Sequence, residues 1–201
     1  MDTRSGLTAM AKLGDALLDI CAILGRYGSA LILVLVFVVM AAIIGAQAGL
    51  GNIAAWDTSI PLFGNHLSLT SIGELQWHLF SLMVMLSGAY ALKEDRHIRV
   101  DVFSAQFSQR TRTLIDLFGD LFLLLPFFAL LTWYSFIFTQ TAYNFGEQSN
   151  AGGLVDRYLV KAVLPIGSVL IVGAAIGRIL KNFGALMEPG KNKSTGGDNL
   201  R

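Results

Sequence analysis

The longest uncharged segment of this chain decides what it can fold into. It runs from Gly28 to Ala55, and none of its 28 residues is Asp, Glu, Lys or Arg. A helix rises about 1.5 Å per residue, so about 20 apolar residues cross the core of a bilayer. Three more charge-free apolar segments follow, at Leu75–Leu92, Leu121–Gly146 and Ala162–Gly177. Four such segments predict an all-α integral membrane protein with four transmembrane helices.

The bulk composition agrees with a membrane location and argues against several other classes. Hydrophobic residues make up 54% of the chain and charged residues 14%, against about 25% charged in ordinary soluble domains. The net charge of +1 gives no field that would attract nucleic acid. A single cysteine rules out an internal disulfide, and no Walker, GxGxxG or CxxC sequence occurs. We therefore expect neither an enzyme nor a cofactor, and no metal site.

Residues 1–26 predict a different element, an amphipathic N-terminal arm. Their apolar residues recur at helical spacing and their charges fall on the opposite side, which is typical of a helix at a membrane surface or against a partner. The apolar stripe comprises Leu7, Met10, Leu13, Leu17, Ile20, Cys21 and Leu24. We expect no part of the chain's own core to cover it. A four-helix membrane domain is predicted over 27–185, and a polar, disordered cytoplasmic tail over 186–201.

Local sequence patterns predict where the membrane helices begin and bend. Ser71-Ile72-Gly73-Glu74 has the capping-box pattern and predicts the start of the second transmembrane helix. Pro126 lies inside the third transmembrane helix and predicts a kink or a loosened turn there. The first loop, over about 50–70, is rich in turn and interface residues.

The distribution of Lys and Arg predicts the orientation in the membrane. Thirteen of them fall in the N-terminal arm, the second loop (93–113) and the C-terminal end. Two fall in or beside the third loop, and none in the first. Because Lys and Arg accumulate on the cytoplasmic side, both termini and the second loop are predicted to be cytoplasmic.

Glu74 and His78 are the first candidate site, because four residues separate them and they share one face of the second helix. Ionisable groups in a membrane are often functional, so the pair could form a proton relay or a ligand site. The alternative is structural: Glu74 caps the helix and complements its dipole, while His78 hydrogen-bonds nearby. The capping-box pattern favours the structural interpretation.

Asp116 and Asp120 form a second candidate pair, near the start of the third helix. Their functional interpretation is ion coordination. The structural alternative is dipole complementation, with Arg112 paired to Asp116 four residues later. We favour the structural interpretation, because acidic groups are common at the start of a helix.

Gly173 and Gly177 in the last helix have the small-xxx-small spacing that suits helix association. No predicted helix carries a charge near its middle, where a carrier that moves its solute alone is expected to bind it. The chain therefore looks like a scaffold, and we expect Gly173 and Gly177 to contact a partner subunit.

Three stretches resemble a known family. They are Glu74-Leu75-Gln76-Trp77-His78-Leu79-Phe80 in the second helix, His97-Ile98-Arg99-Val100-Asp101-Val102 in the second loop, and Lys161-Ala162-Val163-Leu164-Pro165-Ile166-Gly167 leading into the last helix. They resemble the small membrane subunit of tripartite ATP-independent periplasmic (TRAP) transporters. The resemblance covers all four predicted helices.

The resemblance implies a division of labour among three proteins. A periplasmic binding protein captures the solute, commonly an organic acid, and a large membrane subunit carries it, driven by a sodium gradient. The small subunit packs against the large one among the lipids of the bacterial inner membrane. There it scaffolds the large subunit and helps to dock the binding protein, and it has no substrate site of its own.

The same resemblance implies roles for two sets of loop residues. One set orders the cytoplasmic loop and comprises His97, Arg99 and Asp101. The other lies at the periplasmic surface near the binding protein and comprises Glu147, Ser149 and Asn150. For every member of both sets, loop capping or a solvated charge is the structural alternative.

One alternative function comes from a different class: a haem- or quinone-associated membrane anchor of a redox complex. A haem version needs paired axial histidines within the helices. Only His78 lies in a predicted transmembrane helix, so the sequence favours the transporter subunit.

Overall fold

The computed structural model describes residues 3–28, 30–94 and 107–187. The helices in these ranges are α1 (Thr3–Gly28), α2 (Leu31–Gln47), α3 (Leu69–Lys93), α5 (Gln109–Gly119), the π-helix η1 (Asp120–Leu124), α6 (Leu125–Asn144), α7 (Tyr158–Lys161) and α8 (Val163–Met187). Among the described residues, four helical stretches are long and apolar enough to cross a membrane. The predicted all-α membrane protein with four transmembrane helices is therefore confirmed.

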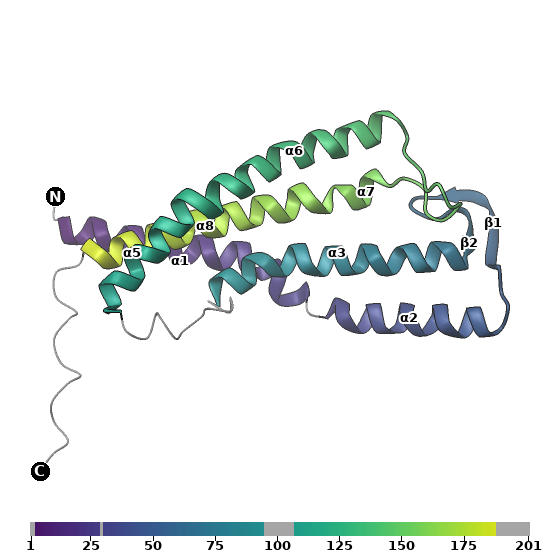
Figure 1. Cartoon of the computed structure of the whole chain (residues 1–201), viewed down its shortest axis with the longest axis horizontal. Coiled ribbons are helices and arrows are strands. Elements are labelled where there is room, and N and C mark those ends of the chain that lie inside the picture. The colour runs from purple at the N-terminus through teal and green to yellow at the C-terminus, as the bar shows by residue number, and fades with distance from the viewer. Residues whose placement is uncertain (1–2, 29, 95–106, 188–201) are drawn as a thin grey trace, which may run out of the picture.

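The four long apolar helices stand in a row, in the order α2, α3, α8, α6 (Figure 1). The central helix α8 contacts α3 on one side and α6 on the other, and α1 packs along its C-terminal half. Helices α2 and α6 form the two edges of the row. Because this is a row, α2 and α6 leave most of their large apolar side chains exposed.

Small residues let the backbones approach closely around α8. Its buried residues are mostly Gly, Ala and Ser: Pro165, Gly167, Ser168, Ile171, Ala174, Ala175, Gly177 and Gly184. A Cβ on Gly167 would lie 2.7 Å from the Cβ of Met85 in α3. One on Gly177 would lie 2.8 Å from the carbonyl oxygen of Gly14 in α1. In lipid there is little hydrophobic drive between helices, so close contact of this kind supplies the association.

Helix α1 is covered by its own chain, contrary to the sequence-based expectation. Its buried residues lie against α8 and α3 and are Gly14, Leu18, Cys21, Ala22, Gly25 and Gly28. The predicted apolar stripe is divided: Cys21 is buried and Leu17 packs against the core, whereas Leu13 and Ile20 are 62% and 65% exposed. The glycine face of α1 packs inward because it lets two backbones approach more closely than a face of Leu and Ile allows.

The same packing corrects the expectation for Gly173 and Gly177. A Cβ on Gly173 would lie 2.7 Å from Sγ of Cys21, and Gly177 lies against Gly14 and Leu18. These positions are therefore occupied by α1 of the same chain, not by a partner subunit.

A β-hairpin replaces the loop expected over 50–70. Strands β1 (Asn52–Ile60) and β2 (Gly64–Ser68) pair antiparallel, with Asn52 opposite Ser68 and Ile60 opposite Gly64. The turn places Leu62 and Gly64 at positive φ, 74° and 65°. Nε1 of Trp56 donates a hydrogen bond to the Gly64 carbonyl oxygen at 2.6 Å and ties the two strands together.

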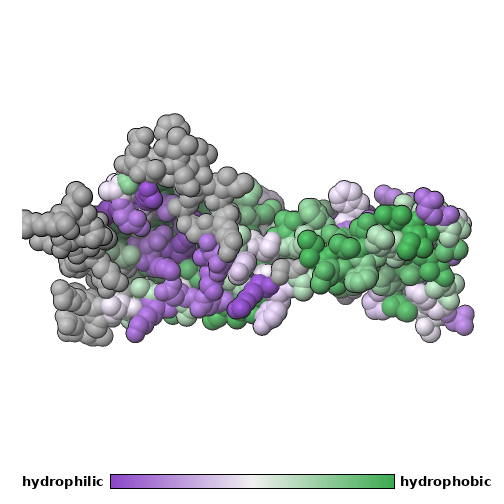
Figure 2. All heavy atoms as spheres, turned by 90° about the horizontal axis from the view of Figure 1, so that it is seen from below, coloured by the Kyte–Doolittle hydropathy of each residue, from purple (hydrophilic) through white to green (hydrophobic). Residues whose placement is uncertain are grey.

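The two ends of the row differ in polarity. Apolar residues predominate over the half next to the hairpin, and polar residues over the half that holds α1, on the face that Figure 2 shows. We call these the hairpin end and the α1 end. In α3, Glu74 near the hairpin end and Lys93 at the α1 end are 19 residues apart, about 28 Å along a helix. That span matches a hydrocarbon core of about 30 Å.

Gly177→Ala tests the close approach of α1 and α8. We expect it to destabilise the full chain by about 1–3 kcal/mol, because the new methyl group must displace the backbone of α1. Gly73→Ala is the matched control, since a Cβ on Gly73 in α3 meets nothing within 4 Å. This control should stabilise by about 0.5–1 kcal/mol. Thermal unfolding in detergent measures both, and equal effects of the two substitutions would contradict the packing described here.

Candidate functional site

Polar side chains gather in two clusters, one at each end of the row. The hairpin-end cluster comprises Glu74, His78, Glu147, Ser149, Arg157 and Lys161. The α1-end cluster comprises Asp15, Asp19, Lys93, Asp120, Arg178 and Lys181. No group of three His, Cys, Asp or Glu side chains in the described ranges is arranged to hold a metal ion.

Glu74 does not cap α3, so the capping-box prediction was wrong in its position. The N-cap is Ser68, whose Oγ accepts a hydrogen bond from the Ser71 amide at 3.1 Å, and the Ser71 side chain returns the bond. The Glu74 carboxylate instead accepts from the Leu154 amide at 2.9 Å and from the Ser149 hydroxyl. It thus anchors the loop between α6 and α7 to α3.

This loop folds tightly around the Glu74 carboxylate. The Ser149 amide donates to the Leu154 carbonyl oxygen at 2.9 Å, and its Oγ accepts from the Ala151 amide at 3.2 Å. Gly153 lies directly beside the carboxylate, and a Cβ there would lie 2.6 Å from it. The Val155 amide donates to the Leu62 carbonyl oxygen at 2.9 Å, which joins the loop to the hairpin turn. Three distant segments therefore form one cap at this end.

Glu147 is the second anchor of the cap. Its carboxylate lies 2.5 Å from Nζ of Lys161 and 3.8 Å from Nη1 of Arg157. The hydrogen bond from Lys161 lowers the pKa of Glu147 below its ordinary value of 4.5. Nζ of Lys161 also lies 3.8 Å above the centre of the Phe138 ring, which joins the cap to α6.

Two other candidate residues from the sequence, His78 and Asn150, also lie at the hairpin end. His78 lies one turn after Glu74, half-buried, and its Nδ1 has no hydrogen-bond partner among the described residues. Asn150 is exposed in the loop next to Ser149. A proton relay through Glu74 and His78 stays a prediction.

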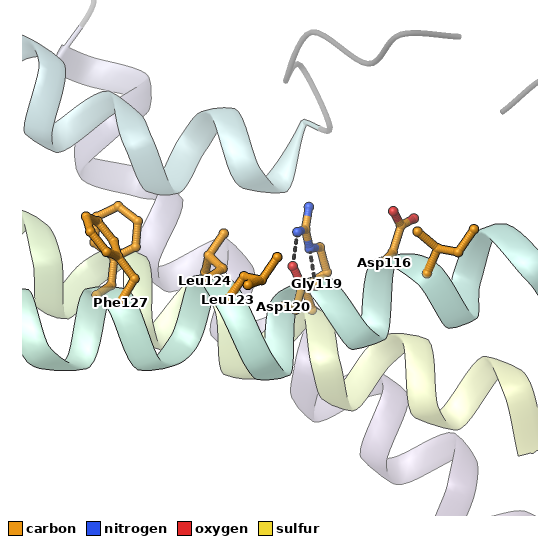
Figure 3. A pocket seen from close by; sticks show the side chains of 9 residues that line it. Asp116, Gly119, Asp120, Leu123, Leu124 and Phe127 are labelled. Atoms are coloured by element: carbon orange, nitrogen blue, oxygen red, sulfur yellow. Dashed lines mark hydrogen bonds and ion pairs between the residues drawn. The ribbon is translucent and has the colours of Figure 1, made fainter. Parts of the chain in front are cut away.

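At the α1 end, Asp120 and Arg178 form a buried ion pair (Figure 3). Nε of Arg178 donates to Oδ2 of Asp120 at 2.6 Å, and Nη2 donates to Oδ1. The Asp120 side chain is only 2% exposed. A bidentate pair of this kind fixes the geometry as well as compensating both charges, and removing one partner leaves a buried charge unpaired. It clamps the start of the third membrane helix to α8.

A π-helical turn brings Asp120 to this position. Residues Asp120–Leu124 form η1, in which the Leu125 amide donates to the Asp120 carbonyl oxygen. Pro126 has no amide proton to donate to the carbonyl oxygen of Phe122, and its ring crowds that oxygen. The widened turn relieves this conflict. The loosened turn predicted at Pro126 is thus located one turn before the proline.

Two exposed ion pairs hold α1 in register. Nζ of Lys181 lies 2.8 Å from Asp15, and Nζ of Lys93 lies 2.8 Å from Asp19. Exposed pairs add at most about 1 kcal/mol each, so the glycine contacts provide most of the adhesion of α1.

Asp116 and Asp120 have different surroundings, and the pairing of Arg112 with Asp116 that the sequence favoured stays a prediction. Asp120 turns inward to Arg178, whereas Asp116 lines an open groove beside it (Figure 3). The sequence did not single out Arg178, although a charge directly after sixteen apolar or small residues pointed to a special position. His97, Arg99 and Asp101 lie outside the described residues.

Glu74→Gln tests the anchoring of the loop. The amide oxygen can still accept from the Leu154 amide, but the amide nitrogen can only donate to the Ser149 oxygen, and the charge that strengthened both bonds is lost. We expect amide hydrogens of residues 147–157 to exchange about tenfold faster, which corresponds to losing about 1.5 kcal/mol. Asp57→Asn, at an exposed position of β1, is the control and should change nothing. Hydrogen-exchange mass spectrometry of the full chain measures this, and unchanged exchange in Glu74→Gln would refute the anchor.

Comparison with known proteins identifies the family. Residues 61–184 match the family described as "Tripartite ATP-independent periplasmic transporters, DctQ component". Comparison with curated proteins and with solved structures gave no match. The matched region includes β2, α3, the carboxylates of Glu74 and Asp120 that anchor other segments, and most of α8. Since it spans more than half of the chain, the resemblance inferred from the sequence is confirmed: the chain belongs to the DctQ family of TRAP transporter small membrane components.

Proposed function

We propose that this chain is the scaffold subunit of a sodium-gradient-driven, binding-protein-dependent transporter for an organic acid or a related solute. The family membership carries the proposal, because members of this family work beside a large membrane subunit and a binding protein. The chain sits in the bacterial inner membrane with both termini cytoplasmic. It neither binds nor moves the solute alone.

The open row supports a scaffold role. A carrier needs polar groups near the middle of the membrane. Here the charge-free stretches are Leu75–Leu92, Leu121–Gly146 and Ala162–Gly177, and the buried charges lie at their ends. The large apolar side chains of α2 and α6 face outward, where lipid or another subunit must cover them.

We place the large subunit against the groove between α6 and α8. This groove has a volume of about 650 Å³ and nearly entirely apolar walls, which include Trp133 and Phe136 of α6 and Ile166 and Val169 of α8. A furrow between two helices receives the side-chain ridge of a third. The outer face of α2 consists mainly of aliphatic side chains and suits lipid.

The cap at the hairpin end faces the periplasm in this arrangement, where it helps to dock the binding protein. Glu147 and Ser149 hold the loop in place through their side-chain contacts. Asn150 is exposed on this loop, where it can contact the binding protein. The Lys and Arg bias supports this orientation.

Reconstitution tests the scaffold role. Proteoliposomes that contain the large subunit, the binding protein and this chain should take up labelled organic acids under an inward sodium gradient. Omitting this chain should abolish uptake, and this chain alone should show none. Uptake by this chain alone would refute the proposal.

Co-purification with the large subunit tests the docking groove. Val169→Trp fills the groove, so we expect it to weaken co-purification about tenfold or more. Phe37→Trp is the control, because Phe37 is 75% exposed on α2. A loss with Phe37→Trp alone would move the large subunit to the α2 edge.

Single-cysteine labelling tests the orientation. In a Cys21→Ser background, a cysteine placed at Asn52 should react with a membrane-impermeant maleimide added from the periplasmic side. One placed at Asn192 should react only from the cytoplasmic side. Labelling of both from one side would show that the predicted topology is wrong.

A further inference from the structure

The side of α1 that points away from α8 and α3 is apolar and exposed. Over the last turns of the helix it comprises Ile20, Ile23, Leu24 and Tyr27, which are between 48% and 74% exposed among the described residues. Positions two apart on a helix point about 200° away from each other, so these side chains lie opposite the buried glycine face of α1. What they contact depends on how deep in the membrane they lie.

The contacts of α1 with α8 give the depth of its middle. Sγ of Cys21 lies 2.7 Å from where a Cβ on Gly173 would be. Gly173 precedes Arg178, the first charge after the uncharged stretch of α8, by five residues, about 7.5 Å along a helix. Cys21 therefore lies beside the apolar part of α8, on the membrane side of Arg178.

The contacts of α1 with α3 give the depth of its last turn. A Cβ on Gly25 would lie 2.5 Å from the carbonyl oxygen of Leu86, and one on Gly28 would lie 3.6 Å from the Leu86 Cβ. Leu86 precedes Lys93 by seven residues, about 10 Å along a helix. The end of α1 therefore reaches about two thirds of the way through one leaflet, since half of the hydrocarbon core is about 15 Å thick.

The two ion pairs of α1 mark where its polar surroundings begin. Asp19 lies 2.8 Å from Lys93 and Asp15 lies 2.8 Å from Lys181, and all four side chains are at least 35% exposed. Arg26 lies on the same side of α1 as Asp19 and has contacts within the chain. Its long side chain leans toward the N-terminus of the helix, and so toward this boundary.

Helix α2 is too short to cross the membrane without α1. Its 17 residues span about 25 Å, less than the hydrocarbon core of about 30 Å. It runs along α3 from the level of Leu86, beside Gly28, to Leu69, beside Gly45. The remaining part of α3, from Leu86 to Lys93, is accompanied by the last turns of α1.

We propose that residues 20–28 of α1 are inserted in the bilayer leaflet at the α1 end, with their outward side covered by lipid acyl chains. The first crossing of the membrane is then made by two helices in series, the end of α1 and the whole of α2. The arm expected over 1–26 is divided near Asp19, and only the part before it lies outside the hydrocarbon. The Tyr27 side chain leans toward the N-terminus of α1, which brings its hydroxyl nearer to the headgroups.

The position of α1 on α8 favours lipid over the large subunit as the covering partner. Helix α1 lies against residues 173–181 of α8, whereas the apolar groove proposed for the large subunit is lined by residues 162–170. The two contacts therefore use opposite halves of α8. An outward side of Ile and Leu, with one tyrosine, suits acyl chains, because it demands no specific hydrogen-bond partner.

Site-directed spin labelling of the full chain in phospholipid vesicles tests this insertion. In a Cys21→Ser background, single cysteines at Ile23 and Tyr27 carry a nitroxide, and power saturation compares its access to oxygen, which dissolves in hydrocarbon, and to a water-soluble nickel chelate. We expect both labels to favour oxygen several-fold. A label at Phe37, 75% exposed on α2, is the control for hydrocarbon, and one at Lys12 is the control for water.

A label at Ile20 should give a ratio between those of Lys12 and Ile23, since it lies near the boundary. Ratios at Ile23 and Tyr27 equal to that at Lys12 would overturn the proposal, because α1 would then lie outside the bilayer. Poor access of both reagents to these labels would also overturn it, because protein would then cover this side. If this poor access appears in vesicles that contain the chain alone, the cover is a second copy; if it appears only with the large subunit present, the cover is that subunit.

Discussion

Close backbone approach around α8 is the constraint on which the rest of the structure depends. In a membrane the hydrophobic effect contributes little to the association of two helices, so the association depends on close van der Waals packing of complementary surfaces. Glycines supply it where α8 meets α1 and α3: Gly177 against Gly14, and Gly167 against Met85. Once α8 is fixed, two polar contacts can form: Asp120 pairs with Arg178 on α8, and the α6–α7 loop donates to Glu74 on α3.

The row of helices makes the chain structurally dependent on its surroundings. A closed bundle buries its own apolar faces, whereas here α2 and α6 bury very few of their residues. We propose that lipid and the large membrane subunit cover those faces.

The sequence predicted the elements of this fold better than their partners. The length of the charge-free segments was enough to predict the four membrane helices, and the position of Pro126 was enough to predict an altered helical turn. Two partners were missed because local explanations were available: the position at a helix start seemed to account for Asp120, and a capping pattern seemed to explain Glu74. The actual partners are distant, since Asp120 pairs 58 residues away and Glu74 bonds to the loop 75 and 80 residues away. The hairpin was missed because its short strands lack a regular alternation of apolar and polar residues.

The π-helical turn at Asp120–Leu124 changes how insertions and deletions in this helix must be interpreted. Such a turn accommodates one extra residue, and each residue rotates an α-helix by about 100°. Deleting one residue from 121–124 would therefore return the turn to ordinary α-helix and leave the Trp133 and Phe136 side of α6 facing the groove that it now lines. In an uninterrupted α-helix the same deletion would rotate that side by about 100°. Sequence alignments that place a gap here thus describe a widened turn that is present or absent, not a rotated helix face.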